Sequence, residues 1–188
     1  MNKAIIILHE IYGINKHISG VCEKYASAGY DVCCPELTGK VFGYHEEKEA
    51  YSYFHSHAGL DPSKIIELLG AVRTKYDKIA VLGFSVGAAI AWRCAESGLC
   101  DAVISIYGSR IRDYTDLVPK CPSLLIFASD EPSFPASEAE RLLENKASTV
   151  IIEGNHGFSD PYSPSYNPAS AAAAEKECDI FLTNAGIL

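Results

Sequence analysis

The sequence lacks any apolar run long enough to cross a membrane, and the apolar run among its first residues is too short for a signal peptide. The opening stretch MNKAIIILHE has one lysine and four branched apolar residues before His9, and no cleavage site follows. Positive charge is also scarce, because 16 lysines and arginines face 24 aspartates and glutamates. The formal net charge of −8 argues against nucleic acid or an anionic membrane as the main partner. We therefore expect a cytoplasmic protein with no membrane segment.

Cysteine is present, but not in a pattern that binds zinc or builds a disulfide framework. The seven cysteines are Cys22, Cys33, Cys34, Cys94, Cys100, Cys121 and Cys178. Their number is odd and their spacings match no zinc motif. Most lie in apolar stretches, where a thiol behaves as a small hydrophobic group. We expect free thiols, no metal and no cofactor, and the adjacent Cys33 and Cys34 are the one pair considered for a redox role.

No linker or internal repeat divides the 188 residues. A chain of this length can bury roughly 70% of the surface that its unfolded form exposes. The expected strands are 4–8, 30–34, 79–82, 101–107, 123–128 and 149–152, and the expected helices are 16–28, 46–57, 62–76, 136–145 and 169–183, with one more helix starting near residue 86. Strands that alternate with helices predict a parallel sheet with helices on both faces. We expect residues 1–188 to form a single α/β domain with about six strands and no cap domain.

The stretch Lys78–Ala91, KIAVLGFSVGAAIA, carries the main functional motif. A G-x-S-x-G sequence between a strand and a helix places its serine on a sharp turn at the carboxyl end of the strand. Glycine is required at Gly83 and Gly87 because a Cβ at either position would strike the neighbouring strand or helix. The helix that begins near Val86 directs free N–H groups and the positive end of its dipole at the reacting oxygen. The alternative is an ordinary glycine-containing turn, but the strand and helix on either side favour Ser85 as a nucleophile.

A serine nucleophile also needs a base and a carboxylate that orients the base. In the α/β-hydrolase arrangement the acid and then the histidine follow the serine along the chain. Asp130 and His156 occur in this order after Ser85, each following an expected strand. Glu131 competes with Asp130, which could also be a turn residue in the sequence SDEP. We predict that Asp130 holds one imidazole nitrogen of His156, while the other takes the proton of Ser85.

The remaining histidines are weaker candidates for the base. His45, His55 and His57 precede the serine motif, in a region that we expect to be exposed. His17 lies on the first expected helix, and we expect it at the surface. A histidine in such a place is usually solvated and takes no part in catalysis.

The oxyanion of an acyl-transfer intermediate needs two hydrogen-bond donors. The backbone amide of the residue after the nucleophile supplies one donor. The other comes from the loop that follows the strand next to the one that ends in the G-x-S-x-G turn. In this chain these positions are Val86 and Ile11. No HGGG sequence is present.

Four motifs together resemble the dienelactone hydrolase family of small α/β-hydrolases. They are HEIYGIN, GFSVGAA, DEPSFP and NHGFS, and the resemblance in order and spacing covers nearly the whole chain. It implies hydrolysis of a small ester or lactone. It also implies that Glu10 contacts the nucleophile at rest and assists its activation. Well-studied members carry a cysteine in G-x-C-x-G, whereas this chain has Ser85, so a thiolate mechanism is excluded at that position.

The best-known substrate of that family is a lactone bearing a carboxylate, which arginines hold. One of these arginines follows the catalytic histidine by four residues, and Asp160 occupies that position here. The nearest remaining cation is Arg110. The loops at the strand ends carry seven aromatic residues, and we expect about half of them to face the substrate pocket. They are Tyr12, Phe42, Tyr44, Tyr107, Phe134, Phe158 and Tyr162. Because Asp160 would repel an anion, we expect neutral small esters to be better substrates than esters with a free carboxylate.

The sequence thus predicts a serine hydrolase that cleaves a small carboxylic ester or lactone through an acyl-enzyme. A thioesterase, peptidase or acyltransferase would use the same three residues, and the pocket decides among them. A catalytically silent binding protein on the same fold is a further alternative. The partner expected is a small-molecule substrate, and we favour a monomer.

Overall fold

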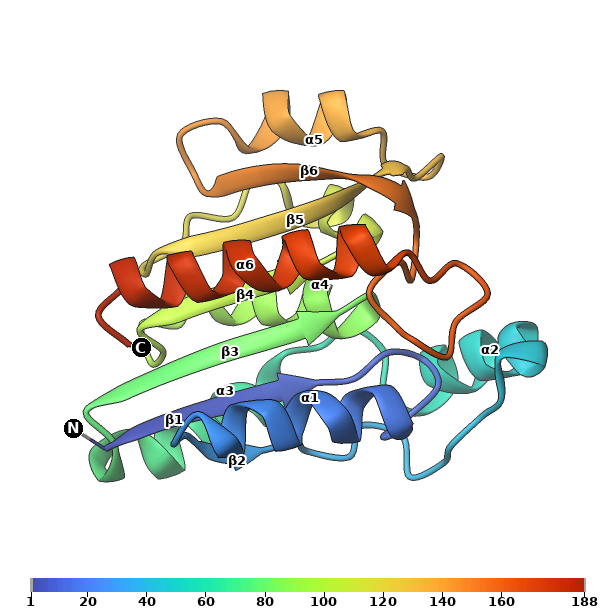
Figure 1. The fold of residues 1–188 in the computed structure, drawn as a ribbon. Coiled ribbons are helices and arrows are strands. Elements are labelled where there is room, and N and C mark those ends of the chain that lie inside the picture. The colour runs from blue at the N-terminus through green and yellow to red at the C-terminus, as the bar shows by residue number, and fades with distance from the viewer. Residues whose placement is uncertain (1, 188) are drawn as a thin grey trace.

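The computed structural model describes residues 2–187. Its centre is a six-stranded parallel sheet with the strand order β2-β1-β3-β4-β5-β6 (Figure 1). The strands are β1 (Lys3–Leu8), β2 (Asp31–Cys33), β3 (Lys78–Phe84), β4 (Ala102–Ile106), β5 (Ser123–Asp130) and β6 (Ser148–Asn155). The direction of the strand order reverses between β1 and β3. Active sites of open α/β sheets lie at the carboxyl ends of the strands at such a point.

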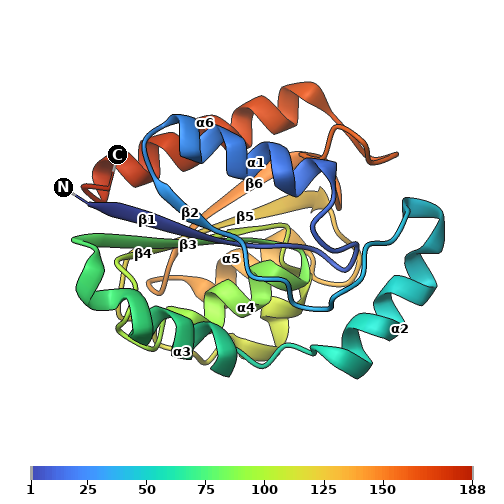
Figure 2. The ribbon, with the colours of Figure 1, turned by 90° about the horizontal axis from the view of Figure 1, so that it is seen from below.

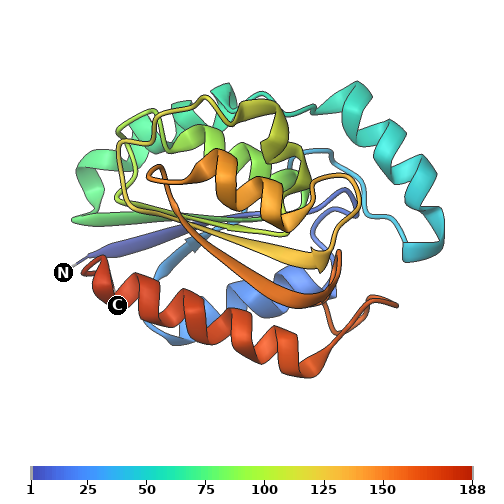
Figure 3. The ribbon, with the colours of Figure 1, turned by 90° about the horizontal axis from the view of Figure 1, so that it is seen from above.

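Helices cover both faces of the sheet. They are α1 (Lys16–Ser27), α2 (Glu47–His57), α3 (Ser63–Val72), α4 (Val86–Cys94), α5 (Ala136–Leu143) and α6 (Pro168–Asn184), with the short 3₁₀ turns η1 (Tyr44–Glu46), η2 (Arg73–Lys75) and η3 (Ser109–Tyr114). Seen along the sheet, α1 and α6 lie on one face, while α3, α4 and α5 lie on the other (Figures 2 and 3). The predicted α/β fold is therefore confirmed.

The hydrophobic pattern of β1 explains why both faces are covered. Ile5 and Ile7 belong to the core on the α1 and α6 side, whereas Ile6 and Leu8 belong to the core on the α4 side. Successive side chains of a strand point to opposite faces of the sheet. A strand that is apolar at consecutive positions, as β1 is from Ala4 to Leu8, must therefore be buried on both sides.

Side-chain caps fix where α1 and α6 begin. Asn15 accepts a hydrogen bond from the backbone N–H of Ile18 at 3.1 Å. Asn167 accepts from the first turn of α6, in which Pro168 takes a position that needs no N–H donor. Among the residues that the structure describes, no helix combines the length and the apolar character needed to span a bilayer.

One histidine lies elsewhere than the sequence predicts. His17 is only 6% exposed, because α1 turns this side chain toward the sheet, where its ring packs edge-on against Phe84 at a centroid distance of 4.9 Å. The prediction of a surface position was wrong. His45, His55 and His57 are exposed, as expected.

Candidate active site

Ser85 lies on a sharp turn between β3 and α4. Its backbone has φ 53° and ψ −114°, a conformation that L-residues rarely adopt and that is typical of strained functional turns. The backbone N–H of Ser85 donates to the carbonyl of Ile106 at 3.0 Å. This bond continues the pairing of β3 with β4 and holds the serine at the end of the sheet.

The two glycines of the motif are sterically required. A Cβ on Gly83 would collide with the backbone of Gly87 and lie 2.7 Å from the nitrogen of Ala88. A Cβ on Gly87 would collide with the carbonyl oxygen of Leu8 and lie 2.6 Å from that of His9. The first turn of α4 thus touches both its own strand and the end of β1, so a side chain at either position would push the turn out of place.

Three side chains form a hydrogen-bonded chain at the carboxyl end of the sheet. Ser85 Oγ lies 2.8 Å from His156 Nε2. His156 Nδ1 lies 2.8 Å from Glu131 Oε2. A base that contacts the hydroxyl with one nitrogen and a carboxylate with the other is the arrangement that activates a serine.

The predicted contact between Asp130 and His156 was wrong, because the neighbouring Glu131 makes it. Asp130 is the last residue of β5 and pairs with Asn155 of β6, next to an irregularity in the strand register. Glu131 is the first residue beyond the strand, and its side chain turns back to the imidazole. Burial favours the neutral form of Glu131, but hydrogen bonds from His156 and Ser133 outweigh burial and lower its pKa to about 2.

Ile11 and Val86 both border the cavity that contains Ser85. Val86 is the first residue of α4, and the first N–H groups of a helix have no partner within the helix. The close approach of Gly87 to the end of β1 brings the loop that carries Ile11 beside the start of α4. This proximity is the arrangement that two oxyanion donors require.

Buried His9 holds the loop after β1 in place. The N–H of Leu37 donates to His9 Nε2 at 3.0 Å, so that Nδ1 can donate to the carbonyl of Glu10 at 2.6 Å. His9 is fully buried. The sequence did not predict a role for this residue, although its position directly after a strand pointed to this edge of the sheet.

Glu10 is a buried carboxyl group beneath the cavity. It is 5% exposed and accepts a hydrogen bond from the Tyr107 hydroxyl at 2.9 Å. The same hydroxyl lies 2.9 Å from Ser159 Oγ. Burial raises the pKa of Glu10 to about 7, against the opposing effects of nearby His156 and of the Tyr107 hydrogen bond.

Tyr107 supports Glu10 from an unusual backbone position. Its φ is 42°, in the left-handed region that a bulky residue rarely adopts, and its N–H donates to Ile126 O at 2.7 Å. The resemblance implied that Glu10 contacts the resting nucleophile. In this structure Tyr107 is the side-chain partner of Glu10, and Ser85 pairs with His156. The sequence could not predict the contacts of the Tyr107 hydroxyl with Glu10 and Ser159, because they join positions far apart in the chain.

The cavity above Ser85 has a volume of about 590 Å³. Of the pocket residues that the sequence predicts, Tyr12, Tyr44 and Arg110 border it. The other predicted pocket residues do not border it, because Tyr107, Phe134 and Phe158 are each at most 1% exposed and belong to the core. Of the seven aromatic residues considered in the sequence, Tyr12 and Tyr44 border the cavity, which is fewer than the half expected.

Asp160 is also absent from the cavity wall. It is fully buried, where it accepts hydrogen bonds from the Tyr44 hydroxyl and, at 2.8 Å, from the backbone N–H of Tyr162. The sequence led us to expect that Asp160 repels an anionic substrate directly. Because Asp160 is not exposed to the cavity, it cannot contact a substrate there. Within residues 2–187, no group of three or more His, Cys, Asp or Glu side chains is arranged to hold a metal ion.

Comparison with known proteins places this chain in a family of hydrolases. The sequence model of the "Dienelactone hydrolase family" matches residues 1–185. The protein YczH of Bacillus subtilis is 38% identical over 172 residues, which cover 88% of this chain and 85% of YczH. Carboxymethylenebutenolidase 1 of Cupriavidus pinatubonensis is 28% identical over 189 residues, which cover 90% of this chain and 81% of that enzyme.

Solved structures share the fold at low sequence identity. A dienelactone hydrolase-like promiscuous phosphotriesterase, P91 from metagenomic libraries, superimposes with a TM-score of 0.74 at 17% identity and covers 97% of this chain and 86% of its own. Esterase 2 of Thermogutta terrifontis superimposes with a TM-score of 0.68 at 16% identity, covering 100% of this chain and 85% of its own. Because the family model spans nearly all of the sequence, the chain belongs to the dienelactone hydrolase family and is a hydrolase of ester bonds.

Proposed function

We propose that this protein is a serine hydrolase that cleaves a small carboxylic ester or lactone through an acyl-enzyme. The observation that carries the proposal is the chain of two 2.8 Å hydrogen bonds from Ser85 through His156 to Glu131. We further propose that residues 1–188 act as one domain, as a monomer in the cytoplasm and without a cofactor.

The proposed reaction starts at the Ser85 hydroxyl. His156 Nε2 takes its proton as Oγ attacks the substrate carbonyl, and Glu131 stabilises the imidazolium that forms. The amides of Ile11 and Val86 bind the oxyanion, and such a donor contributes about 3–4 kcal/mol to the transition state where it has been measured. The imidazolium then gives its proton to the leaving alcohol. Water hydrolyses the resulting ester on Ser85 by the same steps.

In this proposal Glu10 does not accept the proton of Ser85. Its hydrogen bond to Tyr107 and its burial make it an electrostatic neighbour of His156. The Ser85 and His156 pair already supplies a base, so little is gained if Glu10 takes the proton. We expect Glu10→Ala to lower activity by a moderate factor, clearly less than Ser85→Ala.

A fluorophosphonate probe tests the nucleophile directly, because only an activated serine reacts with it. We expect the wild-type protein to be labelled on Ser85 and Ser85→Ala to remain unlabelled. Ser109 also borders the cavity, so Ser109→Ala is the matched control and should label normally. Ester hydrolysis should fall by about 10³-fold or more in Ser85→Ala. Normal turnover by that variant would overturn the proposal.

The acyl-enzyme can be tested separately by mass spectrometry. A reaction with a slowly hydrolysed ester, quenched in acid, should give protein with the added mass of the acyl group on Ser85. A parallel panel of esters, lactones, thioesters and amides with the same acyl group would separate the proposed esterase from enzymes that use the same triad on other bonds. Preference for a thioester or an amide over the matched ester would overturn the substrate assignment but not the nucleophile.

A further inference from the structure

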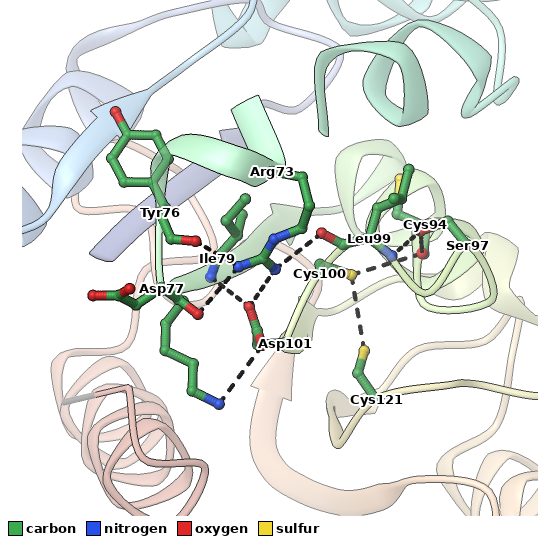
Figure 4. Close-up of polar contacts among 11 residues, drawn as sticks. Arg73, Tyr76, Asp77, Ile79, Cys94, Ser97, Leu99, Cys100, Asp101 and Cys121 are labelled. Carbon is green, nitrogen blue, oxygen red and sulfur yellow. Dashed lines mark hydrogen bonds and ion pairs between the residues drawn. The ribbon is translucent and has the colours of Figure 1, made fainter. Parts of the chain in front are cut away.

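A second polar cluster (Figure 4) lies at the amino ends of β3, β4 and β5. The active site lies at the other end of these strands. At its centre the Sγ atoms of Cys100 and Cys121 are 3.8 Å apart. Cys100 is buried, and Cys121 is partly exposed. This thiol pair takes no part in the proposed ester hydrolysis.

The backbone around Cys100 is fixed by the residues on either side of it. The Asp101 carboxylate accepts from Arg73 Nη1 at 2.6 Å and from the Ile79 N–H at 2.8 Å. The same Arg73 atom donates to the carbonyl of Leu99 at 3.3 Å. The Asp101 N–H donates to Ile79 O at 2.7 Å. Figure 4 shows Arg73 and Asp101 beside Cys100, whose backbone is therefore held at one place beside β3.

The backbone around Cys121 is fixed in the same way. The Lys120 N–H donates to the carbonyl of Ala95 at 2.8 Å, and the carbonyl of Pro122 accepts from the Val103 N–H at 3.1 Å. Cys100 and Cys121 lie just before the neighbouring strands β4 and β5. Their Sγ atoms, now 3.8 Å apart, would have to approach to the bonded distance of about 2.05 Å, so a shift of less than about 2 Å in the sulfur positions suffices.

We propose that Cys100 and Cys121 form a site of reversible oxidation, at which a peroxide converts the two thiols into a disulfide. The Cys121 thiolate attacks one peroxide oxygen, the O–O bond breaks, hydroxide leaves, and Cys121 becomes a sulfenic acid. The Cys100 thiol then attacks that sulfur. An S–S bond forms, the S–O bond breaks, and the thiol proton leaves with the hydroxyl group as water. Two thiols thus lose two electrons to the peroxide, and a dithiol reductant returns them.

The environments of the two sulfurs assign these roles. Cys121 is the member of the pair that solvent reaches. A hydrogen bond from Cys100 lowers the pKa of Cys121, and the same bond together with burial raises the pKa of Cys100. The thiolate is the reactive form of cysteine, so Cys121 meets the oxidant and Cys100 resolves the sulfenic acid.

The other cysteine pair considered in the sequence is less suited to this chemistry. Cys33 and Cys34 are consecutive, and Cys33 lies on the edge strand β2. Adjacent side chains on an extended segment point to opposite sides. Cys94 is near Cys100, but the atom in contact with Cys100 Sγ is the carbonyl oxygen of Cys94, at 3.7 Å.

The disulfide would close a covalent ring that contains β4 and η3. η3 carries Ser109, Arg110 and Arg112, which border the substrate cavity. A cross-link restricts the unfolded chain, so oxidation should raise the melting temperature by several degrees. The reacting groups lie at the other end of the sheet, and the oxidised protein should keep its ester hydrolysis.

Peptide mapping tests the proposal on the native protein. Reduced protein is treated with about one equivalent of hydrogen peroxide, blocked with iodoacetamide and digested with trypsin. We expect a disulfide between peptides 94–110 and 121–141, which dithiothreitol removes. Because Cys94 and Cys100 share a peptide, Cys94→Ser is the matched control and should keep the link. Cys100→Ser should lose it and leave Cys121 as a sulfenic acid that dimedone traps.

The melting temperature provides the second readout. Oxidised wild-type protein should melt several degrees above the dithiothreitol-treated protein, and Cys121→Ser should show no such difference. The proposal is overturned if the link is absent, if it disappears in Cys94→Ser, or if it forms only in denaturant. It is also overturned if Cys121 is oxidised to a sulfenic acid in the wild-type protein without a link to Cys100.

Discussion

His156 Nδ1 lies 2.8 Å from Oε2 of Glu131, and the opposite nitrogen of the same imidazole lies 2.8 Å from Ser85 Oγ. With its pKa lowered to about 2, the Glu131 carboxylate is ionised at every pH at which the protein is expected to work. It can therefore hold the proton of Nδ1 in place and stabilise the imidazolium during proton transfer. The residue before it, Asp130, ends β5.

This arrangement predicts different results for two neighbouring substitutions. Glu131→Gln should lower kcat/KM by about 10²–10⁴-fold, because an amide can present its N–H to the imidazole and favour the wrong tautomer. Asp130→Asn should stay within a few-fold of the wild type. Steady-state hydrolysis of one ester by both variants, with circular dichroism as the folding control, makes the comparison. Equal losses in the two variants would contradict the assignment of Glu131.

The sequence predicts the fold and two members of this hydrogen-bonded chain, Ser85 and His156, because strong local signals mark them. The apolar strands alternate with capped helices, and the G-x-S-x-G turn has glycines that no other residue could replace. The choice between Asp130 and Glu131 depends instead on where β5 ends. Strand ends are uncertain by one or two residues even when a strand is certain, and a shift by one residue exchanges the side chains that face the imidazole.

The sequence also could not predict side-chain contacts between residues that are far apart in the chain. Tyr107 was predicted to line the substrate pocket, but its left-handed backbone directs its hydroxyl to Glu10. Phe134 and Phe158 follow strands at the correct edge, yet both side chains turn into the core. A position in the chain order fixes the edge of the sheet that a residue occupies, but not the direction of its side chain.

The steric role of Gly87 can be measured through stability. Gly87→Ala should strongly destabilise the protein or prevent folding, because its Cβ would collide with the backbone at the end of β1. Gly20 lies in α1, and a Cβ added there would have no neighbour within 4 Å, so Gly20→Ala should stabilise the protein by about 0.5–1 kcal/mol. Urea unfolding of both variants gives the two free energies of unfolding. A Gly87→Ala protein as stable as Gly20→Ala would contradict the close contact.

The raised pKa of Glu10 predicts a dependence of stability on pH. Burial raises its pKa from 4.5 to about 7, so between these values the folded state binds more protons than the unfolded state. The free energy of unfolding therefore falls as pH rises through this window, by on the order of 3 kcal/mol. Glu10→Gln should remove this loss and be more stable than the wild type at pH 8, with little difference at pH 4.5.

Urea unfolding at several pH values measures the effect of Glu10, and Glu47→Gln is the matched control. Glu47 also borders the cavity, but it is exposed, and its neutralisation should leave the pH dependence unchanged. Parallel curves for the wild type and Glu10→Gln across pH 4.5–8 would show that Glu10 titrates in the folded state as it does in the unfolded chain.

The charges on the cavity wall predict a preference for neutral substrates. Glu10, Glu47 and Asp130 border the cavity, while Arg110 is already paired with Asp113 at 2.7 Å. A substrate carboxylate would lose its hydration without an unpaired guanidinium to replace it. We expect a neutral small ester to have a kcat/KM about tenfold above that of the matched ester with a free carboxylate, and the difference to shrink as salt is added.

Two variants on η3 decide whether Arg110 takes part in this discrimination. Asp113 is exposed and contacts both Arg110 and Arg112, so Asp113→Asn should free both guanidinium groups and improve kcat/KM for the anionic ester more than for the neutral one. Arg110→Ala should widen the preference for the neutral ester, because it removes a cation from the cavity wall. If the wild type instead strongly prefers the anionic ester and Arg110→Ala abolishes that preference, then Arg110 binds the substrate carboxylate despite its pairing with Asp113, and the substrate carries a carboxylate as in the lactone associated with this family.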